Sequence, residues 1–132
     1  MAISPTQRTL KALKQMGYKC AVVERWLQHV WRAPGQGRGV RQDMFGIIDI
    51  IALTPTGVLG IQSTGRDFAG HHRMLTCEKQ EACINWLITP GTALELWGWR
   101  KVKAKRGGKA MVWRERVRKY KLGDFIDDDI FN

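Results

Sequence analysis

The sequence predicts a small mixed α/β domain in which one twisted sheet carries a helix on either face. Two observations predict this class. Helical and extended patterns alternate along the chain in the order α-β-β-β-α-β-β, and the apolar run at residues 47–53 is typical of a buried central strand. The chain has 132 residues, 44% of them hydrophobic, which is enough for one core and a single domain over residues 1–132.

A helix and a strand open the chain. Ser4 and Gln7 match a capping box around Pro5, and Gly17 suits the end of the helix. Residues 18–27 are then typical of a strand, and the Gly- and Pro-containing segment that follows is typical of a loop.

A hairpin and a second helix form the centre of the predicted domain. The run at residues 47–53 is followed by a turn at 54–57 and a return strand at 58–64. Apolar residues at helical spacing then predict a helix over residues 70–88.

The C-terminal part predicts a basic hairpin. Strands are expected at residues 93–102 and 110–120, joined at Gly107 and Gly108. An acidic tail, residues 124–132, follows. Three arginines alternate along the last strand and therefore share one face: Arg114, Arg116 and Arg118.

The charge predicts an anionic partner. The chain carries 22 Lys and Arg against 12 Asp and Glu, a net charge of +10, and eleven of the 22 lie between residues 100 and 121. A solvated surface is the alternative interpretation, but the basic chain as a whole favours nucleic acid. Trp97, Trp99 and Trp113 are candidates for stacking on bases, and burial in the core is their alternative.

Cysteine usage and hydropathy exclude other classes. Cys20, Cys77 and Cys83 form no CxxC motif or even framework, which predicts reduced thiols, with Cys77 and Cys83 in the core. No apolar run is long enough to span a bilayer, and the first residues do not resemble a signal peptide. We therefore expect a cytoplasmic protein with no membrane partner.

Asp49 is the most informative residue. A carboxylate inside an apolar strand costs several kcal/mol unless it is paired or binds a metal. A turn at 54–57 places Asp49 opposite Gln62 and Ile47 opposite Thr64. This oxygen-rich cluster suits Mg²⁺. The alternative is an aspartate that caps a helix or pairs with an arginine such as Arg41.

The segments RQDMFGIIDIIAL and VLGIQST resemble the PD-(D/E)XK nuclease superfamily. They are most similar to small phage and prokaryotic members that resemble Holliday-junction resolvases. The resemblance covers about residues 4–102 and is strongest over 41–64. It implies a restriction-endonuclease-like α-β-β-β-α-β core, here with an added basic C-terminal hairpin strand.

The resemblance also implies a site. Asp49 matches the motif aspartate and would be a metal ligand. Gln62 stands where the family has an acid, Thr64 where it has a lysine, and Gln7 near the glutamate of the first helix. The backbone carbonyl of Ser63 would be a further ligand. The implied cofactor is Mg²⁺ or Mn²⁺.

Other side chains could compensate for the two replaced motif residues. Asp43 offers a second carboxylate. Cations could come from the segment after the return strand or from the following helix: Arg66, His71, His72 and Lys79.

The implied function is a metal-dependent endonuclease acting on DNA, with branched DNA as one candidate substrate and a homodimer as the implied assembly. Basic residues of the loop and the hairpin would hold the DNA backbone: Arg38, Arg41, Arg114, Arg116 and Arg118. The loss of the acid and the lysine favours the alternative, a catalytically inactive nucleic-acid-binding protein on the same fold. A protein-binding accessory factor is a third hypothesis.

Overall fold

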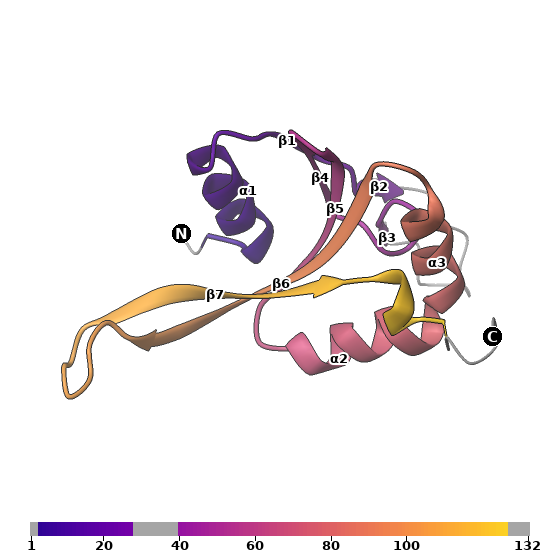
Figure 1. The fold of residues 1–132 in the computed structure, drawn as a ribbon. Helices are drawn as coiled ribbons and strands as arrows, with labels where there is room; N and C mark the ends of the chain where they lie inside the picture. The colour runs from indigo at the N-terminus through magenta and orange to yellow at the C-terminus, as the bar shows by residue number, and fades with distance from the viewer. Residues whose placement is uncertain (1–2, 28–39, 127–132) are drawn as a thin grey trace.

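The computed structural model describes residues 3–27 and 40–126. The protein is a mixed α/β domain built on a five-stranded sheet of order β1-β4-β5-β6-β7 (Figure 1). Of the strand pairs in this sheet, as far as these residues describe it, β5–β6 alone is parallel. The strands of this sheet are β1 (Lys19–Val22), β4 (Ile50–Thr54), β5 (Gly57–Thr64), β6 (Thr92–Lys103) and β7 (Met111–Tyr120).

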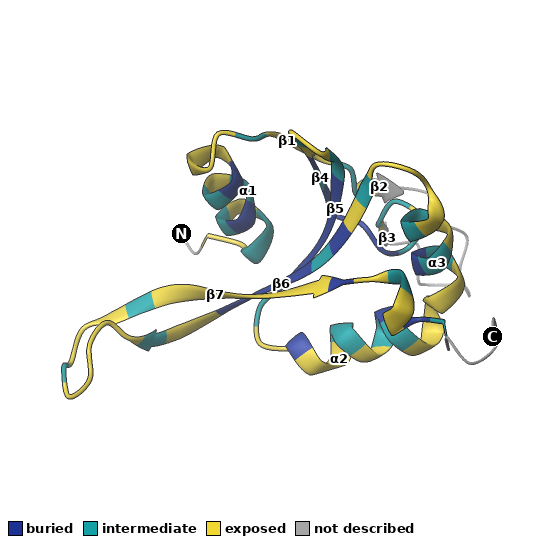
Figure 2. Cartoon of the chain, viewed as in Figure 1, coloured by how far each residue is buried: buried dark blue, intermediate teal, exposed yellow. Residues whose placement is uncertain are grey.

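Helices cover both faces of the sheet (Figure 1). Helix α1 (Pro5–Gln15) packs on one face, where Leu13 joins a core with residues of β4, β5 and β6. The opposite face is covered by α2 (Phe68–Arg73), a π-helical turn (Met74–Glu78) and α3 (Gln80–Ile88). The buried residues of Figure 2 accordingly follow the central strands and the sheet-facing sides of the helices.

The central hairpin has the predicted register. Leu53 pairs with Val58 and Ile50 with Ile61, which is the alignment expected from a turn at residues 54–57. The capping box at the start of α1 is also confirmed, since Ser4 Oγ accepts from the Gln7 N–H at 3.1 Å. The helix crossover then brings β6 parallel to β5. Within the main sheet the predicted order of helices and strands is therefore confirmed.

The predicted strand at residues 47–53 is wrong at its start. Strand β4 begins at Ile50, because the chain turns through Phe45 and Gly46, both at positive φ, and closes with a Met44–Ile48 bridge. Ile47 and Ile48 are fully buried from this turn, which explains their apolar character without a strand. Ile47 is therefore not paired with Thr64.

Two other expected elements are interrupted. The predicted strand 18–27 divides into β1 and β2 (Arg25–Leu27), and β2 pairs with β3 (Val40–Gln42) as a separate ribbon. The predicted helix 70–88 contains the π-helical turn, which leaves Cys77 exposed while Cys83 stays buried. The expectation that Cys77 belongs to the core was wrong.

The β6–β7 hairpin extends well beyond the body of the domain (Figure 1). Gly107 at φ 78° lies in its turn, and the Ala104 N–H donates to the Ala110 carbonyl at 2.9 Å. A short 3-10 helix (Leu122–Asp124) follows β7. The rest of the predicted acidic tail, residues 127–132, lies outside the described residues. No helix within the described ranges is long and apolar enough to cross a membrane.

Candidate metal centre and nucleic-acid surface

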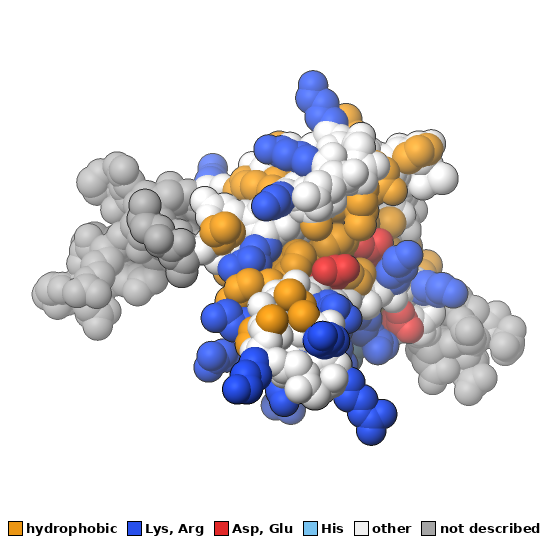
Figure 3. Space-filling model, turned by 90° about the vertical axis from the view of Figure 1, so that its left-hand side faces the viewer, with side chains coloured by type: hydrophobic (Ala, Val, Ile, Leu, Met, Phe, Trp, Pro, Cys, Tyr) orange, Lys and Arg blue, Asp and Glu red, His pale blue; other side chains and the backbone are white. Residues whose placement is uncertain are grey.

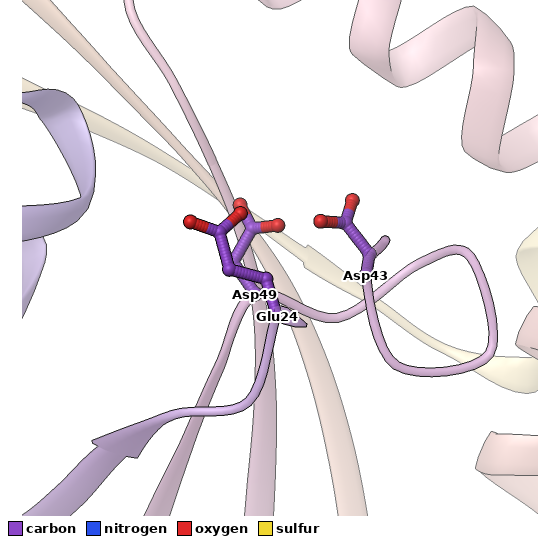
Figure 4. Close-up of side chains that lie close together, drawn as sticks. All are labelled: Glu24, Asp43 and Asp49. Carbon is purple, nitrogen blue, oxygen red and sulfur yellow. The ribbon is translucent and has the colours of Figure 1, made fainter. Parts of the chain in front are cut away.

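Three carboxylates meet where β4 begins (Figure 4). Glu24, Asp43 and Asp49 each place an oxygen within 4.8 Å of the others. Glu24 lies between β1 and β2, Asp43 follows β3, and Asp49 precedes β4. The Val23 N–H donates to the Asp49 carbonyl at 2.7 Å, and this bond fixes the segment of Glu24 beside Asp49. The segments that follow β1 and β3 therefore bring the three carboxylates together at the start of β4.

Asp49 is the buried member of this acidic cluster, with 4% of its surface exposed. Its Oδ2 accepts from the Ser63 N–H at 2.8 Å and from Gln62 Nε2 at 3.3 Å. Burial, followed by a hydrogen bond with Asp43 and the negative charges of Asp43 and Glu24, raises the pKa of Asp49 to about 8, against the lowering effect of the Ser63 N–H. In the absence of a cation, the cluster therefore retains a proton at neutral pH.

Gln62 supplies the neutral oxygen of the site. Its side chain is 4% exposed, and its Oε1 is the buried side-chain atom without a hydrogen-bond partner among the described residues. The same amide group donates to Asp49 through Nε2. An unsatisfied buried carbonyl oxygen costs about 1–3 kcal/mol. A cation beside Asp49 would give this oxygen a partner, because rotation of the amide presents Oε1 to the same place.

A hydrogen-bonded chain holds β5 from the other face of the sheet. Ser63 Oγ and Thr9 Oγ1 lie 2.9 Å apart, and Trp99 Nε1 donates to the same Thr9 oxygen at 2.9 Å. Thr9 Oγ1 also donates to the Pro5 carbonyl at 3.0 Å. These bonds tie α1, β5 and β6 together directly behind the Ser63 N–H that orients Asp49.

The other residues of the implied motif are placed differently. Gln7 is exposed at the start of α1, where its Oε1 accepts from the Ser4 N–H at 3.4 Å. Thr9, two residues further along α1, hydrogen-bonds to Ser63 of β5. Thr64 is buried and follows Gln62 by two residues on β5, so the two share a face of the strand.

The candidate cations after β5 have different environments. His71 Nδ1 lies 2.8 Å from the Asp67 carbonyl oxygen, and His72 Nδ1 lies 2.7 Å from the Tyr120 hydroxyl. Neither histidine belongs to the acidic cluster found among the described residues. Arg66 is exposed. A Cβ at Gly46 would lie 3.2 Å from Lys79 Nζ, which places that ammonium at the turn between Asp43 and Asp49.

The basic residues gather along the projecting hairpin (Figure 3). Arg114, Arg116 and Arg118, here called the β7 arginines, are all exposed, as predicted. Arg38 lies outside the described residues. Arg41 belongs to β3, and its side chain is not described.

The tryptophans of the basic segment have two different environments. Trp97 and Trp99 belong to the core beneath α1 and are unavailable for stacking on bases. Trp113 is 42% exposed, with the Arg8 guanidinium 4.1 Å and the Lys101 ammonium 5.5 Å from its ring centroid. Only Trp113 of these three remains a candidate surface for nucleic acid.

Glu24 is the site residue that sequence reasoning missed. The segment 18–27 has the character of one continuous strand, in which an acidic residue is an ordinary exposed position. The register between β1 and β4 was the available signal. Because β1 is antiparallel to β4, its C-terminal end lies beside Asp49, and Glu24 follows that end. Asp43, in contrast, was recognised as a second carboxylate.

No protein-family model matches this sequence, and comparisons with curated proteins and with solved structures find no match.

Proposed function

We propose that this protein is a Mg²⁺- or Mn²⁺-dependent endonuclease that acts on DNA, on a restriction-endonuclease-like fold of the PD-(D/E)XK type. The observation that carries the proposal is the acidic cluster around buried Asp49, together with the unpartnered Oε1 of Gln62 beside it. The order of helices and strands in the main sheet agrees with that core.

The donor set suits a hard divalent cation. Carboxylate and amide oxygens are the ligands that Mg²⁺ takes in proteins. Asp49, Asp43 and Glu24 offer charged oxygens, and Gln62 offers a neutral one. The N–H and C=O of a strand residue point to the same neighbour, so the Ser63 carbonyl faces the edge at which its N–H meets Asp49.

The carboxylates of the site supply negative charge, and the Ser63 N–H orients one of them. Asp49, Asp43 and Glu24 would hold a Mg²⁺, which would supply a coordinated water of lowered pKa and positive charge beside the scissile phosphate. The Ser63 N–H holds the Asp49 carboxylate in place. Deprotonation of Asp49, whose pKa is about 8, releases the proton shared with Asp43 and completes the charge of the cluster.

The β6–β7 hairpin supplies the charge that DNA requires. The hairpin projects from the body (Figure 1), and exposed lysines and arginines surround it when it is viewed from its tip (Figure 3). Phosphate contacts of this kind give affinity and position without reading sequence. We therefore propose DNA binding with little sequence preference, and a homodimer remains a prediction of the resemblance.

A catalytically inactive DNA-binding protein on the same fold is the second candidate. Gln62 and Thr64 favour it, because Gln provides no charge and Thr provides no cation beside the cluster. Both replacements weaken the chemistry and leave the basic surface intact.

A cleavage assay separates the two. Supercoiled plasmid and a four-way junction are incubated with Mg²⁺ or Mn²⁺ and the wild-type protein, Asp49→Asn, or the control Glu81→Gln, which neutralises an exposed carboxylate on α3. The endonuclease requires metal-dependent cleavage that Asp49→Asn abolishes and Glu81→Gln retains. DNA binding without cleavage would establish the inactive alternative. A protein that neither binds nor cleaves DNA would contradict both candidates.

A further inference from the structure

We propose that the open pocket between α2 and β7 is a phosphate-binding site, separate from the acidic cluster, which holds a phosphate group of a nucleic-acid strand. The pocket has a volume of about 480 Å³, and its lining includes Phe68, Arg116, Arg118, Lys121 and Asp124. The nucleic-acid source of the phosphate rests on the proposed function, whereas the anion site itself does not.

Aromatic rings orient both guanidinium groups of the pocket. Arg116 Cζ lies 4.2 Å from the centroid of Phe68, and Arg118 Cζ lies 5.5 Å from that of Tyr120. Gly98 pairs with Arg116 and leaves room for Phe68, since a Cβ there would lie 2.5 Å from the ring. A guanidinium stacked on a ring keeps its N–H edge available for two parallel bonds to phosphate.

Among the described residues, the positive charge of the pocket is compensated only in part. Neither guanidinium has an ion pair or hydrogen bond to the rest of residues 3–27 and 40–126. Asp124 is the acid that lines the pocket, and its Oδ2 accepts from the Lys121 N–H at 2.7 Å. One capping carboxylate therefore faces two guanidiniums and the Lys121 side chain.

The pKa of His72, on α2, responds to the positive charge of the pocket. Its ring stacks on Tyr120 with centroids 5.7 Å apart, and its Nδ1 lies 2.7 Å from the Tyr120 hydroxyl. Burial and then the charges of Arg118 and Arg116 lower the pKa of His72, and the opposing effect of Asp124 is smaller. A phosphate dianion in the pocket would reverse this balance and favour the imidazolium form.

The pocket and the acidic cluster lie on one face of the sheet. Gln62 on β5 pairs with Leu96 on β6, which pairs with Arg118 on β7. Leu96 between them is fully buried in the core beneath the helices that cover this face, so the pocket and the acidic cluster are two separate sites.

Histidine NMR tests the pocket without cleavage. The ring signals of His72 are followed against pH at low ionic strength, with and without inorganic phosphate, and His71 is the internal control. We expect phosphate to raise the pKa of His72 and to leave the His71 signals unchanged. In the double variant Arg116→Gln/Arg118→Gln without phosphate, the pKa of His72 should be higher than in the wild type. Addition of phosphate should not change the pKa of His72 in this variant.

Oligonucleotides identify the source of the phosphate. The single variants Arg116→Gln and Arg118→Gln should each bind a single strand roughly tenfold more weakly, as expected for loss of a charge-assisted bond, and the control Lys11→Gln on α1 should change affinity less. If a 5′-phosphorylated strand binds more tightly than the same strand without the 5′-phosphate, the pocket holds a terminal phosphate monoester. If the two strands bind equally, the pocket holds a phosphate diester of the backbone. An unchanged His72 titration in wild-type protein would overturn the pocket, whatever the cleavage assay shows. A phosphate response without cleavage would reject only the nuclease.

Discussion

Asp49 should make the protein less stable as the pH rises toward neutrality in the absence of a divalent cation. Its pKa is raised from 3.8 to about 8 in the folded protein. The unfolded chain therefore loses the proton near pH 4, whereas the folded protein keeps it until about pH 8. Between these limits the folded state binds more protons than the unfolded state, so the free energy of unfolding falls with pH.

The magnitude follows from proton linkage. One additional bound proton changes the free energy of unfolding by about 1.4 kcal/mol per pH unit. Between pH 5 and pH 7, Asp49 should thus remove up to roughly 3 kcal/mol. This is an upper value, because Asp43 and Glu24 interact with the same proton.

Asp49→Asn isolates this contribution. Asn is close in shape to the protonated carboxylic acid, and its Oδ1 can accept from the Ser63 N–H and from Gln62. Chemical denaturation at pH 5 and pH 7, with and without Mg²⁺, measures wild-type and variant protein. Without metal, the variant should gain on the wild type as the pH rises. With Mg²⁺ at pH 7, the wild type should recover stability and the variant should not.

The comparison has two outcomes that refute the reasoning. An equal fall in stability with pH in both proteins would mean that Asp49 is already ionised in the folded state. Equal stabilisation of both proteins by Mg²⁺ would place the cation elsewhere. Glu81→Gln is the control for loss of one acidic charge, since its carboxylate lies exposed on α3.

Three further changes have defined outcomes. Gln62→Glu should raise Mg²⁺ affinity in calorimetry, yet lower stability without metal, because a fourth carboxylate enters the acidic cluster; a variant without metal-dependent stabilisation would contradict the site. Thr9→Val should cost about 2–3 kcal/mol in denaturation, because Trp99 Nε1 loses its acceptor; a change below the experimental error would show that Trp99 finds another. Replacing the β7 arginines by Gln should leave the melting temperature nearly unchanged and reduce the slope of log affinity against log salt by about 2.7 on duplex DNA; an unchanged slope would exclude them as phosphate contacts.

Local patterns predicted the frame of the site. The capping box, the turn at residues 54–57 and the alternating arginines each depend on neighbours in sequence, and each is confirmed. The hairpin register brought Asp49 and Gln62 into contact. These features could be predicted because strand pairing across a short turn has few alternatives.

The features that sequence reasoning missed depend on packing between distant segments. Glu24 joins Asp49 only because β1 pairs with β4. Ile47 has the apolar character of a strand residue, although it is buried from a turn. Trp97 lies in a basic segment, yet it faces the core beneath α1. For Ile47 and Trp97 burial, rather than local conformation, set the residue type, and periodicity cannot distinguish the two.

The distribution of charge gives the two faces of the β6–β7 hairpin different roles. On the α1 side, Arg8 and Lys101 both lie over the Trp113 ring. This ring therefore already contacts two cationic side chains of the protein itself. On the α2 side, Phe68 and Tyr120 orient two guanidiniums that have no acidic partner among the described residues. The acidic cluster lies on the face of the α2 side as well, two strands away. A cation at the cluster and a phosphate in the pocket would therefore neutralise charges of opposite sign, and the nucleic acid proposed above is a ligand that would supply phosphate.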